Sequence, residues 1–106
     1  MRKAVVRINN RQAGWLTQDE KGYQFVYDSH YLLQPDANAA SLTLPLQSAP
    51  FNSPSLFPFF DGLIPEGWLL EIAIRNWKLN PRDRMGLLLS CCKDCIGSVS
   101  IDEVLE

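Results

Sequence analysis

Three cysteines within five positions are the first place in this sequence to look for chemistry. The segment reads Cys91-Cys92-Lys93-Asp94-Cys95, and Cys92 and Cys95 have the spacing of a redox dithiol or of half a zinc site. A structural zinc site needs four ligands, and no second cysteine pair accompanies this one. The cysteines also fall at the end of a predicted helix, where the helix dipole disfavours a thiolate. We interpret them as small apolar residues that close the core, and keep a thiol or zinc protein using Cys92 and Cys95 as an alternative.

The other titratable residues do not suggest a catalytic set. His30 is the single histidine, and no nearby serine or cysteine reads as its nucleophile, so we expect a surface or turn position. Asp61 and Glu66 flank Gly62, but one carboxylate at a helix end and one at the next helix start are more simply explained by capping. Neither G-x-G-x-x-G nor G-x-x-x-x-G-K occurs. The sequence therefore predicts no enzyme activity, no metal and no cofactor.

Length and composition are those of an ordinary globular domain. The chain has 106 residues, 46% of them hydrophobic and 21% charged, which fits one domain over residues 1–106. A net charge of −2 and a pI near 5.3 argue against direct binding of nucleic acid, which favours basic surfaces. No apolar run approaches the roughly 20 residues that cross a bilayer, and the N-terminus does not read as a signal peptide. We expect a cytoplasmic protein without a membrane contact.

Alternating apolar residues predict strands toward both ends of the chain. They are expected over residues 2–8, 13–17, 23–27 and 41–46, with a last strand that carries Val99 and Ile101. The polar stretches after the first two strands predict tight turns, because Asn and Gly tolerate left-handed backbone. Pro45 cannot donate a ladder hydrogen bond, so the strand over 41–46 is expected at a sheet edge or a strand end.

The periodicity becomes helical after an expected loop at 47–55. We expect a short helix over Phe57–Phe60, capped by Ser53 or Ser55, then a helix from Pro65 to about Leu79, then a third capped by Asn80. The buried face of the third helix is expected to carry Met85, Leu88, Leu89 and Cys92. Strands followed by helices and one returning strand predict an α+β fold, a small antiparallel sheet with about three helices packed on one face.

The second predicted helix carries the clearest binding signal. Its buried stripe is expected to comprise Leu70, Ala73, Ile74 and Trp77. Trp68 and Ile72 then project from the opposite side, and an exposed tryptophan is a frequent interface hot spot. The alternative is that the 47–55 loop folds over them. The partner-binding residues predicted here are Ile64, Pro65, Glu66, Gly67, Trp68 and Ile72.

Several segments, in order, resemble the N-terminal subdomain of HipA-type toxin kinases. The most characteristic is Phe59-Phe60-Asp61-Gly62-Leu63-Ile64-Pro65-Glu66-Gly67, preceded by Ser41-Leu42-Thr43-Leu44-Pro45-Leu46. Asp83-Arg84-Met85-Gly86-Leu87-Leu88 and Asp94-Cys95-Ile96-Gly97-Ser98-Val99 are similar too. Cys91, Cys92 and Ser98 depart from the family where it often has glycine and alanine, which affects packing more than function.

The resemblance implies a binding role rather than a catalytic one. The ATP-binding and catalytic residues of these kinases lie beyond this subdomain, so no active-site residue is carried over. A free-standing copy is similar to HipS, the antitoxin of three-component HipBST systems, which implies binding to a HipT-like Ser/Thr kinase toxin in a complex with a HipB-like DNA-binding protein. The alternative is a non-inhibitory N-terminal scaffold piece of a split HipA-type kinase.

Overall fold

The first three strands form a continuous antiparallel meander at the centre of the molecule. A computed structural model describes residues 2–64, 71, 72, 74–76, 78, 80, 82–91 and 99–104. Strand β1 (Arg2–Ile8) pairs with β2 (Arg11–Asp19), and β2 pairs with β3 (Gly22–Tyr27). Asn9 and Asn10 turn the chain with φ of 53° and 65°, the left-handed backbone of a two-residue hairpin turn, so the predicted hairpin is confirmed.

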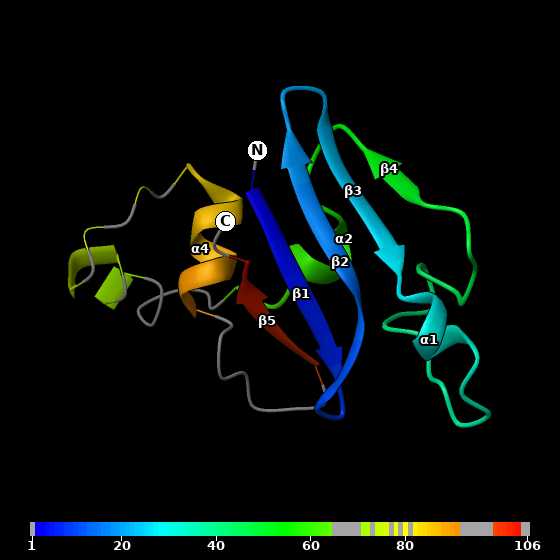
Figure 1. The fold of residues 1–106 in the computed structure, drawn as a ribbon. Coiled ribbons are helices and arrows are strands. Elements are labelled where there is room, and N and C mark those ends of the chain that lie inside the picture. The colour runs from blue at the N-terminus through cyan, green and yellow to red at the C-terminus, as the bar shows by residue number, and fades with distance from the viewer. Residues whose placement is uncertain are drawn as a thin grey trace.

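Two further strands extend the sheet at its edges. Strand β5 (Val99–Glu103) pairs antiparallel with β1, and β4 (Phe51–Ser53) pairs antiparallel with β3. The order is β4-β3-β2-β1-β5, so the first and last strands of the chain lie side by side (Figure 1). Val99 and Ile101 face the core, as predicted. The antiparallel sheet of the predicted α+β fold is confirmed.

The edge strand beside β3 is not where the sequence pattern placed it. Residues 41–46 form a turn with one isolated bridge between Ser41 and Leu44, and the strand lies instead at Phe51–Ser53, inside the expected loop. The Phe51 ring stacks on Phe25 of β3 at 6.3 Å between centroids. Alternation was the wrong guide here, because pairing with β3 depends on cross-strand contacts that a local pattern does not contain.

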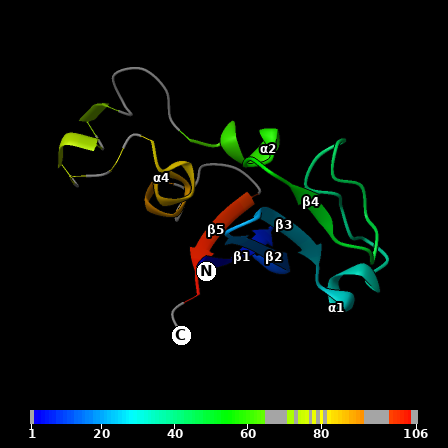
Figure 2. The same ribbon diagram turned by 90° about the horizontal axis from the view of Figure 1, so that it is seen from above.

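Two helices lie on one face of the sheet, α2 (Pro58–Asp61) and α4 (Arg84–Cys91) (Figure 2). Phe57 occupies the N-cap of α2 without a side-chain cap, so the prediction of Ser53 or Ser55 as the cap is wrong. Pro58 at the first helical position starts the helix instead.

A short helix that the sequence analysis did not predict, α1 (Ser29–Leu32), follows β3. No helix among the described residues is long and apolar enough to span a membrane.

The core lies between the sheet and the helices α2 and α4. Its largest fully buried side chains are Phe25, Phe60, Leu16, Met85, Leu87, Leu88, Ile101 and Val6. Met85 and Leu88 are buried as predicted, Leu89 is partly buried, and Leu87 joins them although the predicted stripe omitted it. Phe60 contacts Phe25 edge-on at 5.4 Å, which connects α2 to the middle of the sheet.

Candidate partner-binding surface

The helical segment around Ile72 is the described part of the predicted binding surface. Residues 71, 72 and 74–76 are helical. The Ile72 side chain is 45% exposed, whereas Ile74 is partly buried and packs against the core. Glu71 and Arg75 beside Ile72 are exposed. The two isoleucines therefore have the predicted orientations, and the segment presents an aliphatic side chain between charged neighbours.

The other predicted contact residues divide into one buried residue and four outside the description. Ile64 is 2% exposed and belongs to the core, so its side chain stabilises the fold and is not available on the surface. The turn and helix start, Pro65, Glu66, Gly67 and Trp68, lie outside the described residues, as do Leu70, Ala73 and Trp77 of the expected stripe. Partner contact by this turn and by Trp68 stays a prediction.

Helix α4 follows the Ile72 segment in the chain and begins at a capping aspartate. The Asp83 carboxylate accepts a hydrogen bond from the Gly86 backbone N–H at 3.1 Å, and the Asp83 carbonyl accepts from Leu87 N–H at 3.0 Å. This is the geometry of an N-cap, so the prediction that Asn80 caps the helix is wrong. Asn80 instead accepts from Arg82 N–H at 2.9 Å and closes the turn before the helix.

The same carboxylate joins α4 to the sheet. Arg2 at the start of β1 donates two hydrogen bonds to Asp83, at 2.9 and 2.6 Å, and a third to Gln18 of β2 at 3.1 Å. The hydrogen bonds from Arg2 hold the pKa of Asp83 below its usual range. A Cβ at Gly86 would collide with the Asp83 carboxylate, so the absence of a side chain there permits this arrangement.

A second ion pair links α4 to α2. Arg84 donates through Nε to the Asp61 carboxylate at 2.7 Å. Asp61 is the last residue of α2, so this contact bridges two helices; its capping role stays a prediction, because the start of the next helix lies outside the described residues. The other carboxylate of the supposed pair, Glu66, lies outside the described residues. Together the two ion pairs fix α4 to both the sheet and α2.

The remaining candidates for chemistry are accounted for as follows. His30 is exposed in α1, where its backbone N–H donates to the Asp28 carboxylate at 2.8 Å, a surface position as predicted. The side chains of Cys91, Cys92 and Cys95 lie outside the described part of the chain. Within the part that is described, no three residues of the types His, Cys, Asp or Glu gather as a metal site would require.

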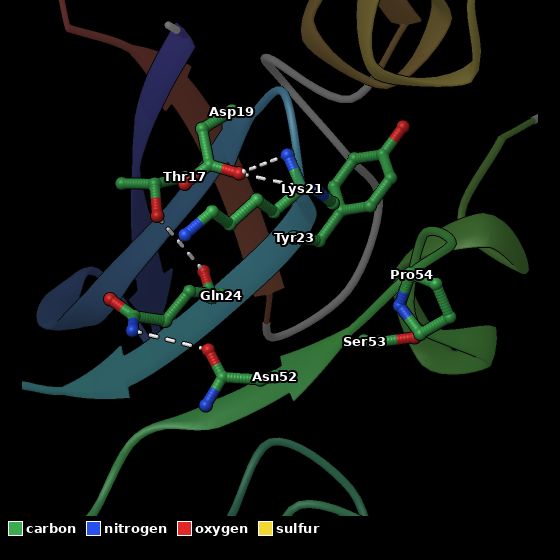
Figure 3. Close-up of a pocket in the computed structure, with 9 residues that line it drawn as sticks. Thr17, Asp19, Lys21, Tyr23, Gln24, Asn52, Ser53 and Pro54 are labelled. Atoms are coloured by element: carbon green, nitrogen blue, oxygen red, sulfur yellow. Dashed lines mark hydrogen bonds between the residues drawn. The ribbon is translucent and has the colours of Figure 1, made fainter.

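A groove of about 550 Å³ runs along the β2–β3 hairpin and the end of β4 (Figure 3). Its polar side chains bond mainly to one another and to the nearby backbone. Asp19 accepts from the backbone N–H groups of Lys21 and Gly22, at 2.8 and 3.1 Å, and Gln24 donates to Asn52 at 3.2 Å. These bonds hold the hairpin tip and the neighbouring strand together. They do not aim a set of groups at a ligand.

A region that the sequence analysis had not considered for binding also exposes large apolar side chains. Among the described residues the exposed large hydrophobic side chains are Leu33, Leu42, Leu46 and Ile72. Three of these four lie between α1 and β4. The sequence contains one indication of this uncharged region: no charged side chain occurs between Ala37 and Phe60, although 21% of the residues in the whole chain are charged.

The five-stranded antiparallel sheet with helices on one face defines a small α+β domain. Residues 4–102 match the HipA N-terminal domain family, and the chain belongs to this family. An uncharacterized protein of Haemophilus influenzae is 32% identical over 103 residues, which cover 97% of this chain and 93% of the relative. A solved structure described as the N-terminal domain of HipA toxin matches with a TM-score of 0.71 and 27% identity, covering 100% of this chain and 95% of that chain.

Proposed function

We propose that this protein is an antitoxin that binds and neutralises a HipT-like Ser/Thr kinase toxin, in a complex that also contains a HipB-like DNA-binding protein. The observation that carries the proposal is the family match over residues 4–102, since the matched domain is the N-terminal domain of a HipA toxin. The Haemophilus influenzae relative supports it, because 93% of that protein is covered by this one domain. In this role the domain acts by binding and not by catalysis.

The docking surface that we propose is formed by Pro65, Glu66 and Gly67 of the turn together with Trp68 and Ile72, without the buried Ile64. The 45% exposure of Ile72 supports it, because the side chain can be buried by a partner without disturbing the core. The exposed Glu71 and Arg75 would surround this contact with charge, as in the polar rim of a protein interface.

Co-expression with the HipT-like kinase of the same genome tests the proposal. We expect cells that express the kinase to resume growth when this protein is present, and the two proteins to co-purify. Co-purification without restored growth would favour the alternative of a scaffold piece of a split kinase. No association at all would contradict the proposed function. Calorimetric titration of the isolated protein with ATP is the companion measurement, and saturable binding would contradict a role by binding alone.

Two substitutions test the proposed surface. We expect Trp68→Ala and Ile72→Asp to leave the fold intact and to weaken kinase binding, with roughly thirtyfold weaker affinity for the tryptophan if it is a central contact. Arg82→Asp, on an exposed residue in the turn before α4, is the control and should have little effect on affinity. Thermal unfolding of each variant separates loss of binding from loss of folding. Unchanged affinity in both variants would move the interface elsewhere on the domain.

A further inference from the structure

An ion pair crosses the base of the chain segment that carries Ile72. Asp61 is the last residue of α2 and Arg84 is the first residue of α4. Arg84 Nε donates to the Asp61 carboxylate at 2.7 Å, although the two residues are 23 positions apart in the sequence. Ile72 lies midway between them in the chain. The pair therefore closes this segment, residues 62–83, into a loop whose two ends are held together.

Both ends of the segment leave this base through hydrogen-bonded turns. On the α2 side, Ile64 N–H donates to the Asp61 carbonyl at 3.2 Å, and the Ile64 side chain is buried in the core. On the α4 side, Asp83 N–H donates to the Asn80 carbonyl at 3.1 Å. The contact between the Asp61 and Arg84 side chains joins these two turns, so it helps to set how one end of the segment is placed relative to the other.

Two consecutive residues attach the start of α4 to different elements. Asp83 accepts two hydrogen bonds from Arg2 of β1, at 2.9 and 2.6 Å, whereas Arg84 reaches α2. A helix attached at one point can rotate about that point, but a helix attached in two directions cannot. In both views α4 lies between the sheet and the helical segment with Ile72 (Figures 1 and 2). The end of the segment that enters α4 is thus oriented as well as held.

The pair is too exposed to contribute much to the stability of the domain. The side chains of Arg84 and Asp61 are 39% and 43% exposed, and water and salt screen ion pairs of this kind. A contact that closes a loop nevertheless restricts the positions that the loop can take. A partner that meets a restricted surface loses less entropy when it binds. The consequence of this ion pair is therefore expected in binding by the segment.

We propose that Asp61 and Arg84 are positioning residues for kinase docking, and that their ion pair sets where the segment presents Ile72 to the HipT-like kinase. This inference rests on the proposed function, because the kinase is the partner named there. Neither Asp61 nor Arg84 has to touch the kinase. Both act through the docking surface, which distinguishes them from Trp68 and Ile72.

The test is the affinity of Asp61→Ala for the HipT-like kinase of the same genome, measured by calorimetry. We expect binding weaker by about fivefold, with an unfolding temperature lowered by about 5 °C or less. Exchanging the charges, Asp61→Arg with Arg84→Asp, should recover most of the affinity. The matched control is Asp102→Ala, which breaks the pair between Arg7 of β1 and Asp102 of β5. Those side chains are 38% and 34% exposed, and the affinity should stay within about twofold of the wild type.

A second measurement separates positioning from direct contact. In a Trp68→Ala protein the proposed central contact is already absent, so adding Asp61→Ala should weaken binding further by less than about twofold. A residue that itself contacts the kinase would give the same fivefold loss in both backgrounds.

Each contrary outcome has a separate meaning. A wild-type protein that does not bind the kinase overturns both the antitoxin proposal and this one. An Asp61→Ala protein that binds as tightly as the wild type overturns the positioning role and leaves the antitoxin proposal standing. Equal losses in the two backgrounds, an equal loss in Asp102→Ala, or no recovery on charge exchange also overturn the positioning role. If the alanine variant is unfolded, Asp61→Asn decides by the same comparisons.

Discussion

The turn over residues 41–46 and helix α4 are both fixed to the body of the domain, but by opposite kinds of interaction. The turn is held by the neutral hydroxyls of two buried tyrosines, Tyr27 and Tyr31. Helix α4 is held by charged groups whose side chains are between 35 and 43% exposed, Arg2 with Asp83 and Arg84 with Asp61. The strength of the tyrosine hydrogen bonds depends on their burial. The strength of the ion pairs depends on charges that are accessible to water and salt.

This difference indicates how each region responds to its surroundings. A hydrogen bond to a buried phenol is little affected by salt, and its loss leaves backbone groups without a partner. A partly exposed ion pair is screened by water and salt and contributes less. The turn over residues 41–46 should therefore be the more firmly fixed of the two, and α4 the more easily displaced.

Tyr27→Phe is expected to give the largest effect. It removes a hydroxyl that serves both Ala40 N–H and the Leu44 carbonyl, so we expect a loss of about 2–3 kcal/mol in the free energy of unfolding. The backbone of residues 40–44 should also lose its fixed position. Denaturant unfolding measures the loss of stability. Equal stability of the variant and the wild type would contradict a stabilising role for these two hydrogen bonds.

Asp83→Ala is expected to be the next largest. The change removes the cap of α4 together with both hydrogen bonds from Arg2, and we expect a loss of about 1–2 kcal/mol in unfolding free energy. Asp83→Asn retains one acceptor oxygen for the Gly86 N–H and loses the negative charge and one of the two hydrogen bonds from Arg2, so its cost should be about 0.5–1 kcal/mol and below that of Asp83→Ala. If the asparagine variant is as unstable as the alanine variant, the ion pair matters more than the cap. Unfolding in urea distinguishes them.

The pH dependence of stability is expected to give the smallest effect and to differ in sign between the two regions. Arg2 holds the pKa of Asp83 below its usual range, so the unfolded chain takes up this proton first as the pH falls. The stability that the pair contributes is thus present above about pH 4 and is lost as the pH falls below it. Asp83→Asn should lose this acid dependence, by less than about 1 kcal/mol.

At the alkaline end the turn over residues 41–46, held by Tyr27, is the sensitive region. Burial raises the pKa of Tyr27, so the unfolded chain releases the phenol proton first as the pH rises. The stability contributed by neutral Tyr27 is present below about pH 10 and is lost above it. Tyr27→Phe should flatten this limb, whereas Asp83→Asn should not. A wild-type curve whose alkaline limb is unchanged by Tyr27→Phe would contradict this assignment.

The candidate site was predictable from sequence only where local periodicity controls it. The opposite orientations of Ile72 and Ile74 follow from helical spacing, and the structure agrees. The burial of Ile64 was missed because it depends on how the chain after α2 meets the core. Asp83, rather than Asn80, caps α4, and this choice depends on Arg2 at the other end of the chain.

The sequence by itself determined the hairpin strands, the α+β class and the family. Asn9 and Asn10 carry their turn preference in their own chemistry, and strand alternation is a property of neighbouring residues. Only the tertiary structure decided which segment pairs with β3 and where the backbone of residues 40–44 is held. The physical reason is that both depend on side chains distant in sequence: Phe25 stacks on Phe51 and favours that edge strand, while the Tyr27 hydroxyl holds the alternating segment as a turn.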